Sequence, residues 1–88
     1  MRHLTSSRFW QCFGALPADV QGLARRNYAL LKQNPVHPSL RFKEVCRGRY
    51  RSIRVGIHYR ALGVPVPLGI QWFWIGRHDE YEQWLDQG

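Results

Sequence analysis

The chain has 88 residues, of which 44% are hydrophobic and 14% aromatic, and it carries a formal net charge of +7. This composition excludes an intrinsically disordered chain, and the length predicts a single domain, residues 1–88, with one core. It contains no apolar run near the ~20 residues that a membrane span needs, and no apolar signal stretch follows Met1. We therefore expect a cytoplasmic protein without membrane contact.

The positive charge is concentrated in the central part of the chain. Four of the six acids lie at the C-terminal end: Asp79, Glu80, Glu82 and Asp86. The densest basic stretch consists of Arg41, Lys43, Arg47, Arg49, Arg51, Arg54 and Arg60. Such a stripe is typical of a surface that binds nucleic acid or an acidic protein partner. The alternative is a basic face that is only solvated.

The cysteines and histidines show no metal-ligand pattern. Cys12 and Cys46 have no CxxC or Cys/His spacing, so free thiols in a reducing compartment are expected. The chain also lacks a Gly-rich phosphate loop and a serine-nucleophile motif. We expect no metal and no cofactor.

The first half of the chain has a helical period. Apolar residues at helical spacing predict one helix that contains Phe9, Trp10, Phe13 and Leu16. Pro17 suits the first turn of a second helix, which Pro35 ends and whose apolar positions are Val20, Leu23, Ala24, Tyr28 and Leu31. The two segments predict an antiparallel helical hairpin.

The second half has mostly the period of strands. We expect strands at residues 40–43, 50–55, 59–62 and 68–75, with Gly56-Ile57-His58 as a hairpin turn. Trp72, Phe73 and Trp74 are assigned mainly to the core, and residues 78–86 to a short amphipathic helix. The predicted fold class is α+β: an N-terminal helical hairpin packed on a small antiparallel β-sheet with a short C-terminal helix.

Basic residues on neighbouring strands predict a phosphate site. If residues 56–58 form the turn, Arg54 and Arg60 face each other and can converge on one phosphate, because each guanidinium can bind two oxygens. The alternative is a pair of surface arginines bridged to the acidic terminal helix. Arg41 and Lys43 lie on the neighbouring strand, only one of them is expected to share the site face, and Lys43 is favoured.

His78 stands at the corner between the last strand and the terminal helix. Histidine transfers protons near neutral pH, so His78 is a candidate acid or base, with a structural cap as the alternative. Tyr81 either stacks on an RNA base or belongs to the core. His58, in the turn beside the two arginines, is a reserve candidate for proton transfer.

The strings LPADVQ, NPVHPSLRFK, YRSIRV, YRALG and IQWFWIGRHDEY, in this order and spacing, resemble the RelE/ParE superfamily of toxins from bacterial type II toxin–antitoxin systems. The resemblance covers nearly the whole chain. It implies a RelE-like fold, a cognate antitoxin as partner and, in many members, cleavage of mRNA on the ribosome. Other members poison DNA gyrase. A third alternative is an inactive subunit that binds the antitoxin, and promoter DNA would be bound only by the toxin–antitoxin complex.

The resemblance also implies roles for particular residues. Arg54 corresponds to an arginine that contacts the scissile phosphate, and His78 to a histidine that takes part in proton transfer. Tyr81 is matched to a C-terminal aromatic, although Asp79 stands directly after the histidine, where some members have the aromatic. Some members carry a carboxylate base near the first sheet strand, where Glu44 is the only acid of this chain.

Metal-free RNA cleavage requires removal of the 2′-OH proton, stabilisation of the charged phosphate and protonation of the departing 5′ oxygen. The histidine near the C-terminus favours this chemistry over gyrase poisoning, which needs no proton transfer. The expected function is that of a toxin acting as a ribosome-dependent endoribonuclease. The expected catalytic residues are Arg54, His78, Arg60 and Tyr81, and the expected RNA-binding residues are Arg41, Lys43, Arg51 and His58.

Overall fold

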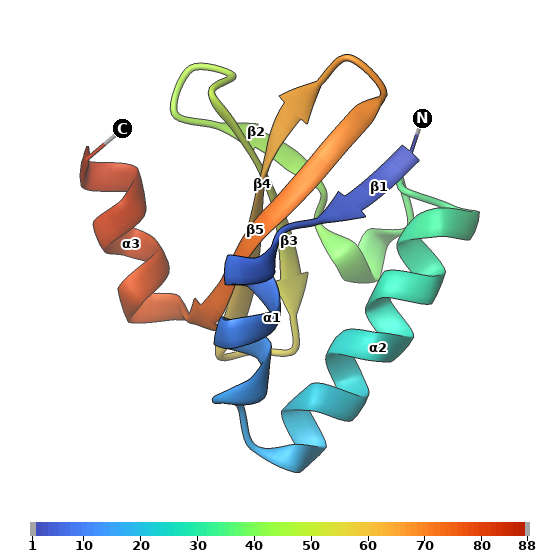
Figure 1. Ribbon diagram of the computed structural model, residues 1–88, viewed down its shortest axis with the longest axis vertical. Helices are drawn as coiled ribbons and strands as arrows, with labels where there is room; N and C mark the ends of the chain where they lie inside the picture. Colours follow the sequence, from blue (N-terminus) through green and yellow to red (C-terminus); the bar gives the residue numbers. More distant parts are fainter. Residues whose placement is uncertain (1, 88) are drawn as a thin grey trace.

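The computed structural model describes residues 2–87 and has the expected α+β architecture (Figure 1). Its elements in chain order are β1 (Arg2–Thr5), α1 (Ser7–Gly14), α2 (Ala18–Gln33), the short 3₁₀ helix η1 (Pro38–Leu40), β2 (Lys43–Val45), β3 (Tyr50–Val55), β4 (Tyr59–Val66), β5 (Gly69–Arg77) and α3 (His78–Gln87). The strands form one sheet in the order β1-β5-β4-β3-β2. Within residues 2–87, no helix has the length and apolar character to cross a bilayer.

The sheet is mixed, which corrects the expectation of a purely antiparallel one. Strands β2 to β5 pair antiparallel, but β1 pairs in parallel with β5, with Arg2 opposite Gly69. The sequence did not predict β1, because its four residues include only one aliphatic side chain and so show no alternation of apolar and polar positions. Pairing with the long strand β5 supplies the stability that the segment lacks by itself.

The strand expected at residues 40–43 is also corrected. Residues Pro38–Leu40 form η1, and the backbone of Arg41 then adopts a left-handed conformation with φ 48°. An extended strand cannot pass through such a residue, so β2 begins only at Lys43.

The first core lies between the sheet and the two N-terminal helices. Phe9 and Phe13 of α1 and Ala24 and Leu31 of α2 are buried in one cluster with side chains of β3, β4 and β5. The two helices follow each other as expected, but they diverge from the linker between them (Figure 1). An apolar groove of about 480 Å³ separates them, with Trp10 on its wall, so they do not form a closely packed hairpin.

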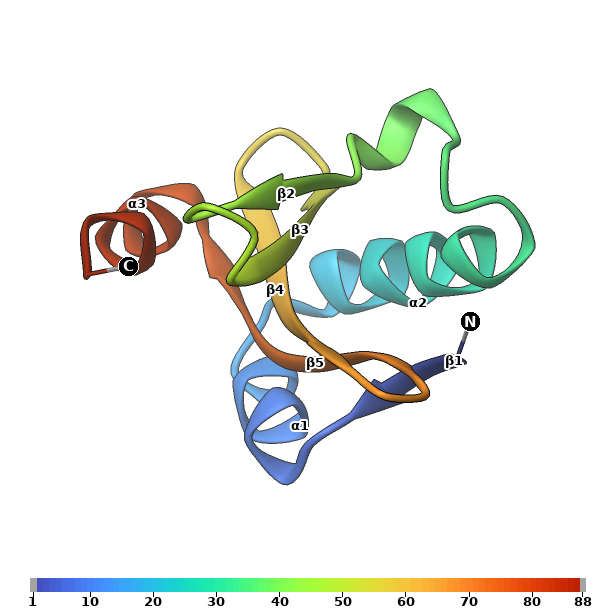
Figure 2. The same ribbon diagram turned by 90° about the horizontal axis from the view of Figure 1, so that it is seen from above.

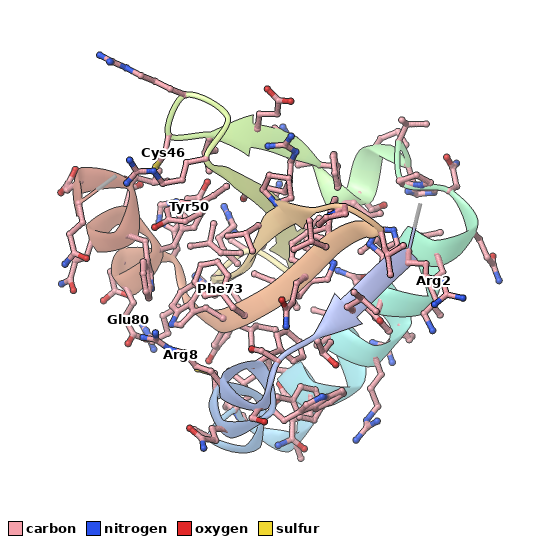
Figure 3. All side chains as sticks on the ribbon, turned by 45° about the horizontal axis from the view of Figure 1, so that its top comes forward. Arg2, Arg8, Cys46, Tyr50, Phe73 and Glu80 are labelled. Carbon is pink, nitrogen blue, oxygen red and sulfur yellow. The ribbon has the colours of Figure 1, made fainter. Side chains whose placement is uncertain are left out.

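The second core lies on the opposite face of the sheet, under α3 (Figure 2). Tyr50 and Phe73 lie side by side on this face (Figure 3), with ring centroids 5.6 Å apart. Trp84 of α3 packs on Phe73, with ring centroids 5.4 Å apart. The buried hydroxyl of Ser52 donates a hydrogen bond of 3.1 Å to the hydroxyl oxygen of Tyr81. These contacts fix α3 on the sheet.

A bulge explains how neighbouring tryptophans enter opposite cores. Leu62 is opposite Trp74 and Gly63 is opposite Trp72, so Phe73 is an extra residue in β5. The extra residue resets the alternation, and Trp72 packs in the first core while Trp74 packs in the second. Their assignment to the core is confirmed, since Trp72 is 1% and Trp74 is 6% exposed.

His3 anchors β1 through its backbone and its ring. Its carbonyl accepts a hydrogen bond of 2.9 Å from the Tyr28 hydroxyl, and its Nδ1 accepts one of 3.2 Å from Nε1 of Trp72. Burial, followed by nearby positive charge that includes Lys32, lowers the pKa of His3 below its ordinary value of 6.5. The folded chain therefore keeps this ring neutral, as the Trp72 hydrogen bond requires.

This anchor makes folding stability depend on pH. Because the pKa of His3 is lower in the folded chain, the unfolded chain binds more protons below about pH 6.5. The neutral His3 ring therefore makes its complete contribution to the free energy of unfolding above that pH. This contribution is lost as the pH falls. We expect His3→Gln to reduce the difference in unfolding free energy, measured with urea, between about pH 7.5 and about pH 5. The exposed-residue control His58→Gln should keep the wild-type difference, and an unchanged difference in His3→Gln would contradict the assignment.

Candidate nucleic-acid interface

The hairpin of β3 and β4 places two arginines opposite each other. Arg54 pairs in register with Arg60, so their side chains leave the same face of the sheet. The turn between the strands depends on Gly56, whose φ is +67° and where a Cβ would lie 2.8 Å from Leu23. The turn predicted at residues 56–58 therefore sets the register that pairs the arginines.

The two guanidinium groups are held by backbone carbonyls. Arg54 Nε donates to the Gly56 carbonyl at 3.1 Å, and Arg60 Nη1 donates to the carbonyls of Tyr59 at 2.7 Å and Ile57 at 3.3 Å. These bonds orient both side chains without neutralising either charge. Both side chains are therefore oriented by the turn, and the site remains strongly positive.

Burial, and next the charge of Arg54, lowers the pKa of Arg60 below its ordinary value, and Arg41 acts in the same direction. The guanidinium still stays protonated at neutral pH, so Arg60 is a partly buried cation that the charges of Arg54 and Arg41 also repel. Among residues 2–87, none of these three arginines forms an ion pair with a carboxylate. A bound anion would relieve this repulsion.

The acids of α3 pair elsewhere, which argues against the alternative of arginines bridged to that helix. Asp79 lies 3.5 Å from Nε of Arg77, and Glu82 lies 3.4 Å from Nε2 of His78. Glu82 attracts Arg60 only from beyond ion-pair distance. The arginine pair thus keeps its positive field beside an acidic helix.

His78, the first residue of α3, lies at the same end of the sheet. Its backbone N–H donates to the His58 carbonyl at 2.8 Å, which ties the start of α3 to the β3–β4 turn. Its ring centroid is 5.8 Å from that of Tyr81, and the guanidinium carbon of Arg60 is 6.0 Å from the Tyr81 ring. Contacts therefore connect Arg60 to His78 through Tyr81, and the His78 side chain is 46% exposed.

Of the two alternatives for Tyr81, stacking on an RNA base or a place in the core, the structure shows the second. It is 4% exposed, and its hydroxyl is engaged with Ser52 beneath α3. An RNA base could reach the ring only if α3 left the sheet. Tyr81 is instead a positioning residue that contacts Arg60 on one side and His78 on the other.

Arg41 and Lys43 both have access to the arginine pair. Lys43 is opposite Ser52, so it shares the face of Arg54. Arg41 lines a pocket with Arg54, and its charge reaches Arg60. The expectation that only one of them reaches the site is wrong: residues two apart in a strand leave the same face, and Arg41 lies before β2 with a left-handed backbone.

The structure does not bring Arg51 to this site. Arg51 is opposite Glu44, and their side chains form an ion pair of 3.3 Å on the other face of the hairpin from Arg54. Glu44 is therefore not placed to act as a base beside Arg54. His58 is exposed in the turn, and it contacts the site through its backbone carbonyl, which accepts the hydrogen bond from the His78 N–H. Within residues 2–87, no three His, Cys, Asp or Glu side chains converge on a common metal position.

Sequence reasoning missed the contribution of α2. Nδ2 of Asn27 donates to the Arg54 carbonyl at 3.0 Å and so ties β3 to the helix. The signal was present, because Asn27 lies midway between Leu23 and Leu31, four residues from each, on the apolar stripe of α2. A polar residue in such a stripe has a specific partner to satisfy.

Comparisons with known proteins identify the fold. No family model matches the sequence, and no curated protein matches it. The structure is similar to a chain in the crystal structure of the RelB–RelE antitoxin–toxin complex from Methanococcus jannaschii, with a TM-score of 0.72 and 14% identity. The similarity covers 92% of this chain and 96% of that chain. At this identity the likeness establishes the fold alone, and the expected RelE-like architecture is confirmed.

Proposed function

We propose that the protein is the toxin of a toxin–antitoxin pair and that it cleaves mRNA on the ribosome without a metal ion. The observation that carries the proposal is the pair Arg54 and Arg60, held opposite each other without a carboxylate partner among residues 2–87 and connected through Tyr81 to His78. The similarity to a chain of an antitoxin–toxin complex supports the proposal. This activity would be exerted in the cytoplasm.

The proposed reaction divides the work between the arginines and the histidine. The 2′ oxygen forms a bond to phosphorus, the bond from phosphorus to the 5′ oxygen breaks, and the products are a cyclic phosphate and a 5′ hydroxyl. Arg54 and Arg60 bind the phosphate oxygens and stabilise the charge that develops on them. His78, with Glu82 within 3.4 Å of its ring, transfers a proton to or from the reacting oxygens.

Substitutions at the site test this division of roles. We expect Arg54→Ala, Arg60→Ala and His78→Ala each to reduce mRNA cleavage on translating ribosomes by about 10²-fold or more, as loss of a charge-stabilising or proton-transferring group does. The measurement is primer extension on a defined transcript. Arg51→Ala is the matched control, because Arg51 is paired with Glu44 on the other face, and it should stay within a few-fold of wild type. Tyr81→Phe, which keeps the ring, should also cleave.

Two results would contradict the ribonuclease proposal. One is growth arrest with intact transcripts, and accumulation of cleaved gyrase–DNA complexes in the same cells would then support a gyrase poison. The other is wild-type cleavage by all three alanine variants, which would show that these side chains take no part in the chemistry.

We further propose that the antitoxin binds the groove between α1 and α2. The wall of the groove is apolar and aromatic, and includes Trp10, which is 46% exposed. Arg25 lies over the ring of Phe13 and Lys32 over the ring of Tyr28, so positive charges stand beside this wall. A segment with apolar and acidic side chains would complement both features.

The antitoxin proposal predicts neutralisation by a neighbouring gene product. Co-expression of a small acidic protein from the adjacent reading frame should relieve the growth arrest caused by wild type but not that caused by Ala29→Trp, which would fill the groove. Ala18→Trp, exposed at the start of α2, is the control and should remain neutralised. Equal neutralisation of both variants would show that the antitoxin binds elsewhere.

A further inference from the structure

A pocket of about 540 Å³ opens beside the arginine pair, where α2, η1 and the β3–β4 turn meet. Arg41 and Arg54 line it, and Arg54 also belongs to the arginine pair, so the pocket borders the phosphate site described above. Because Arg54 belongs to both, a ligand bound by the arginine pair lies next to this pocket.

Part of the pocket wall is apolar and exposed. Leu23 and Pro38 contribute to this wall, and Ile57 completes it from the tip of the turn. Ile57 is 70% exposed, although burying a side chain of this size would be worth about 1.5–3 kcal/mol to the fold. The fold does not use this apolar surface, so it is free for a ligand.

Polar groups in the pocket are available for hydrogen bonds. The amide nitrogen of Asn27 is used by the Arg54 carbonyl, and that bond leaves the Oδ1 acceptor of the same side chain for a ligand. Ser39 is exposed and adds a hydroxyl that can donate or accept. The pocket therefore combines an apolar wall, two hydrogen-bonding side chains and two guanidinium groups.

A nucleobase matches this combination. Its flat faces are apolar and stack on aliphatic surfaces or guanidinium planes, while its edge carries donors and acceptors. A base is joined through its sugar to the backbone phosphate, so a phosphate bound by Arg54 brings a neighbouring base within reach. An acidic peptide side chain would use the guanidinium groups but would leave the apolar wall uncovered.

We propose that this pocket binds the base of a nucleotide adjoining the phosphate held by Arg54 and Arg60, and that it gives the protein a base-dependent affinity for RNA. The proposal rests on the proposed action on RNA and adds a place at which base identity can be read. Arg54 then serves two functions, because it binds the phosphate and also lines the base pocket.

Binding of short oligonucleotides tests the pocket without relying on cleavage. The probe is a fluorescent single-stranded RNA with 2′-O-methyl groups, which block attack by the 2′ oxygen, compared with the same strand carrying an abasic sugar at each position in turn. We expect one abasic position to weaken binding to wild type by on the order of tenfold, since a stacked base contributes that much to single-strand affinity.

A pocket-filling variant identifies where the base binds. Ser39→Trp should bind the full strand only as tightly as wild type binds the abasic one, and should no longer distinguish the two. The backbone N–H of residue 39 donates the hydrogen bond to His37 Nδ1, so replacing the side chain retains this bond at the start of η1. Val36→Trp is the control: Val36 is 81% exposed just before η1 and does not line the pocket, so this variant should keep the discrimination.

Equal binding of the full and abasic strands by wild type would overturn the base pocket, and so would discrimination that survives in Ser39→Trp. In either case a loss of affinity in Arg54→Ala would leave the proposed action on RNA standing. Failure of the proposed function is seen separately, as intact transcripts in the ribosome assay.

Discussion

Charge repulsion between two guanidinium groups, held opposite each other across β3 and β4, is the constraint on which the rest of the structure depends. Arg54 and Arg60 would separate if their side chains were free, but the register of the hairpin and the carbonyls of the turn keep them together. Gly56 permits that turn, and Asn27 holds the strand end against α2. The fold thus maintains a concentration of positive charge that a bound anion would stabilise.

Helix α3 completes the site through its packing. Its aromatic side chains cover the sheet face that also carries the arginines, and Tyr81 lies between Arg60 and His78. Because Tyr81 is buried and bonded to Ser52, it fixes the position of both neighbours relative to the sheet. Glu82 of α3 pairs with His78 and Asp79 with Arg77, so the helix positions a histidine without neutralising Arg54 or Arg60.

The sequence predicted the elements that have a clear period and missed those that depend on tertiary partners. The helices, the β3–β4 hairpin and α3 follow from apolar spacing, and the turn at residues 56–58 followed from Gly56. Strand β1 could not be predicted, because its extended conformation is stabilised by pairing with β5 and by the hydrogen bonds of His3. The left-handed Arg41 likewise has no signal in the pattern of residues 40–43.

The same distinction applies to the candidate site. The facing of Arg54 and Arg60 follows from strand register, which the sequence sets through the turn. Other features of the site depend on how the helices pack on the sheet, which the periodicity of the sequence does not determine. These are the burial of Tyr81, the pairing of Arg51 with Glu44 and the hydrogen bond from Asn27 to Arg54. Charge density alone could not separate Arg51 from Arg54, although they leave opposite faces of one strand.

Titration of the arginine side-chain Nε–H signals by nuclear magnetic resonance tests the central claim most directly. With a 2′-O-methyl RNA strand as ligand, the signals of Arg54 and Arg60 and the ring signals of His78 should shift together with one common Kd, while that of Arg51 stays in place. A shift of Arg51 without Arg54 and Arg60, or separate Kd values for the two paired arginines, would show that they do not bind one phosphate.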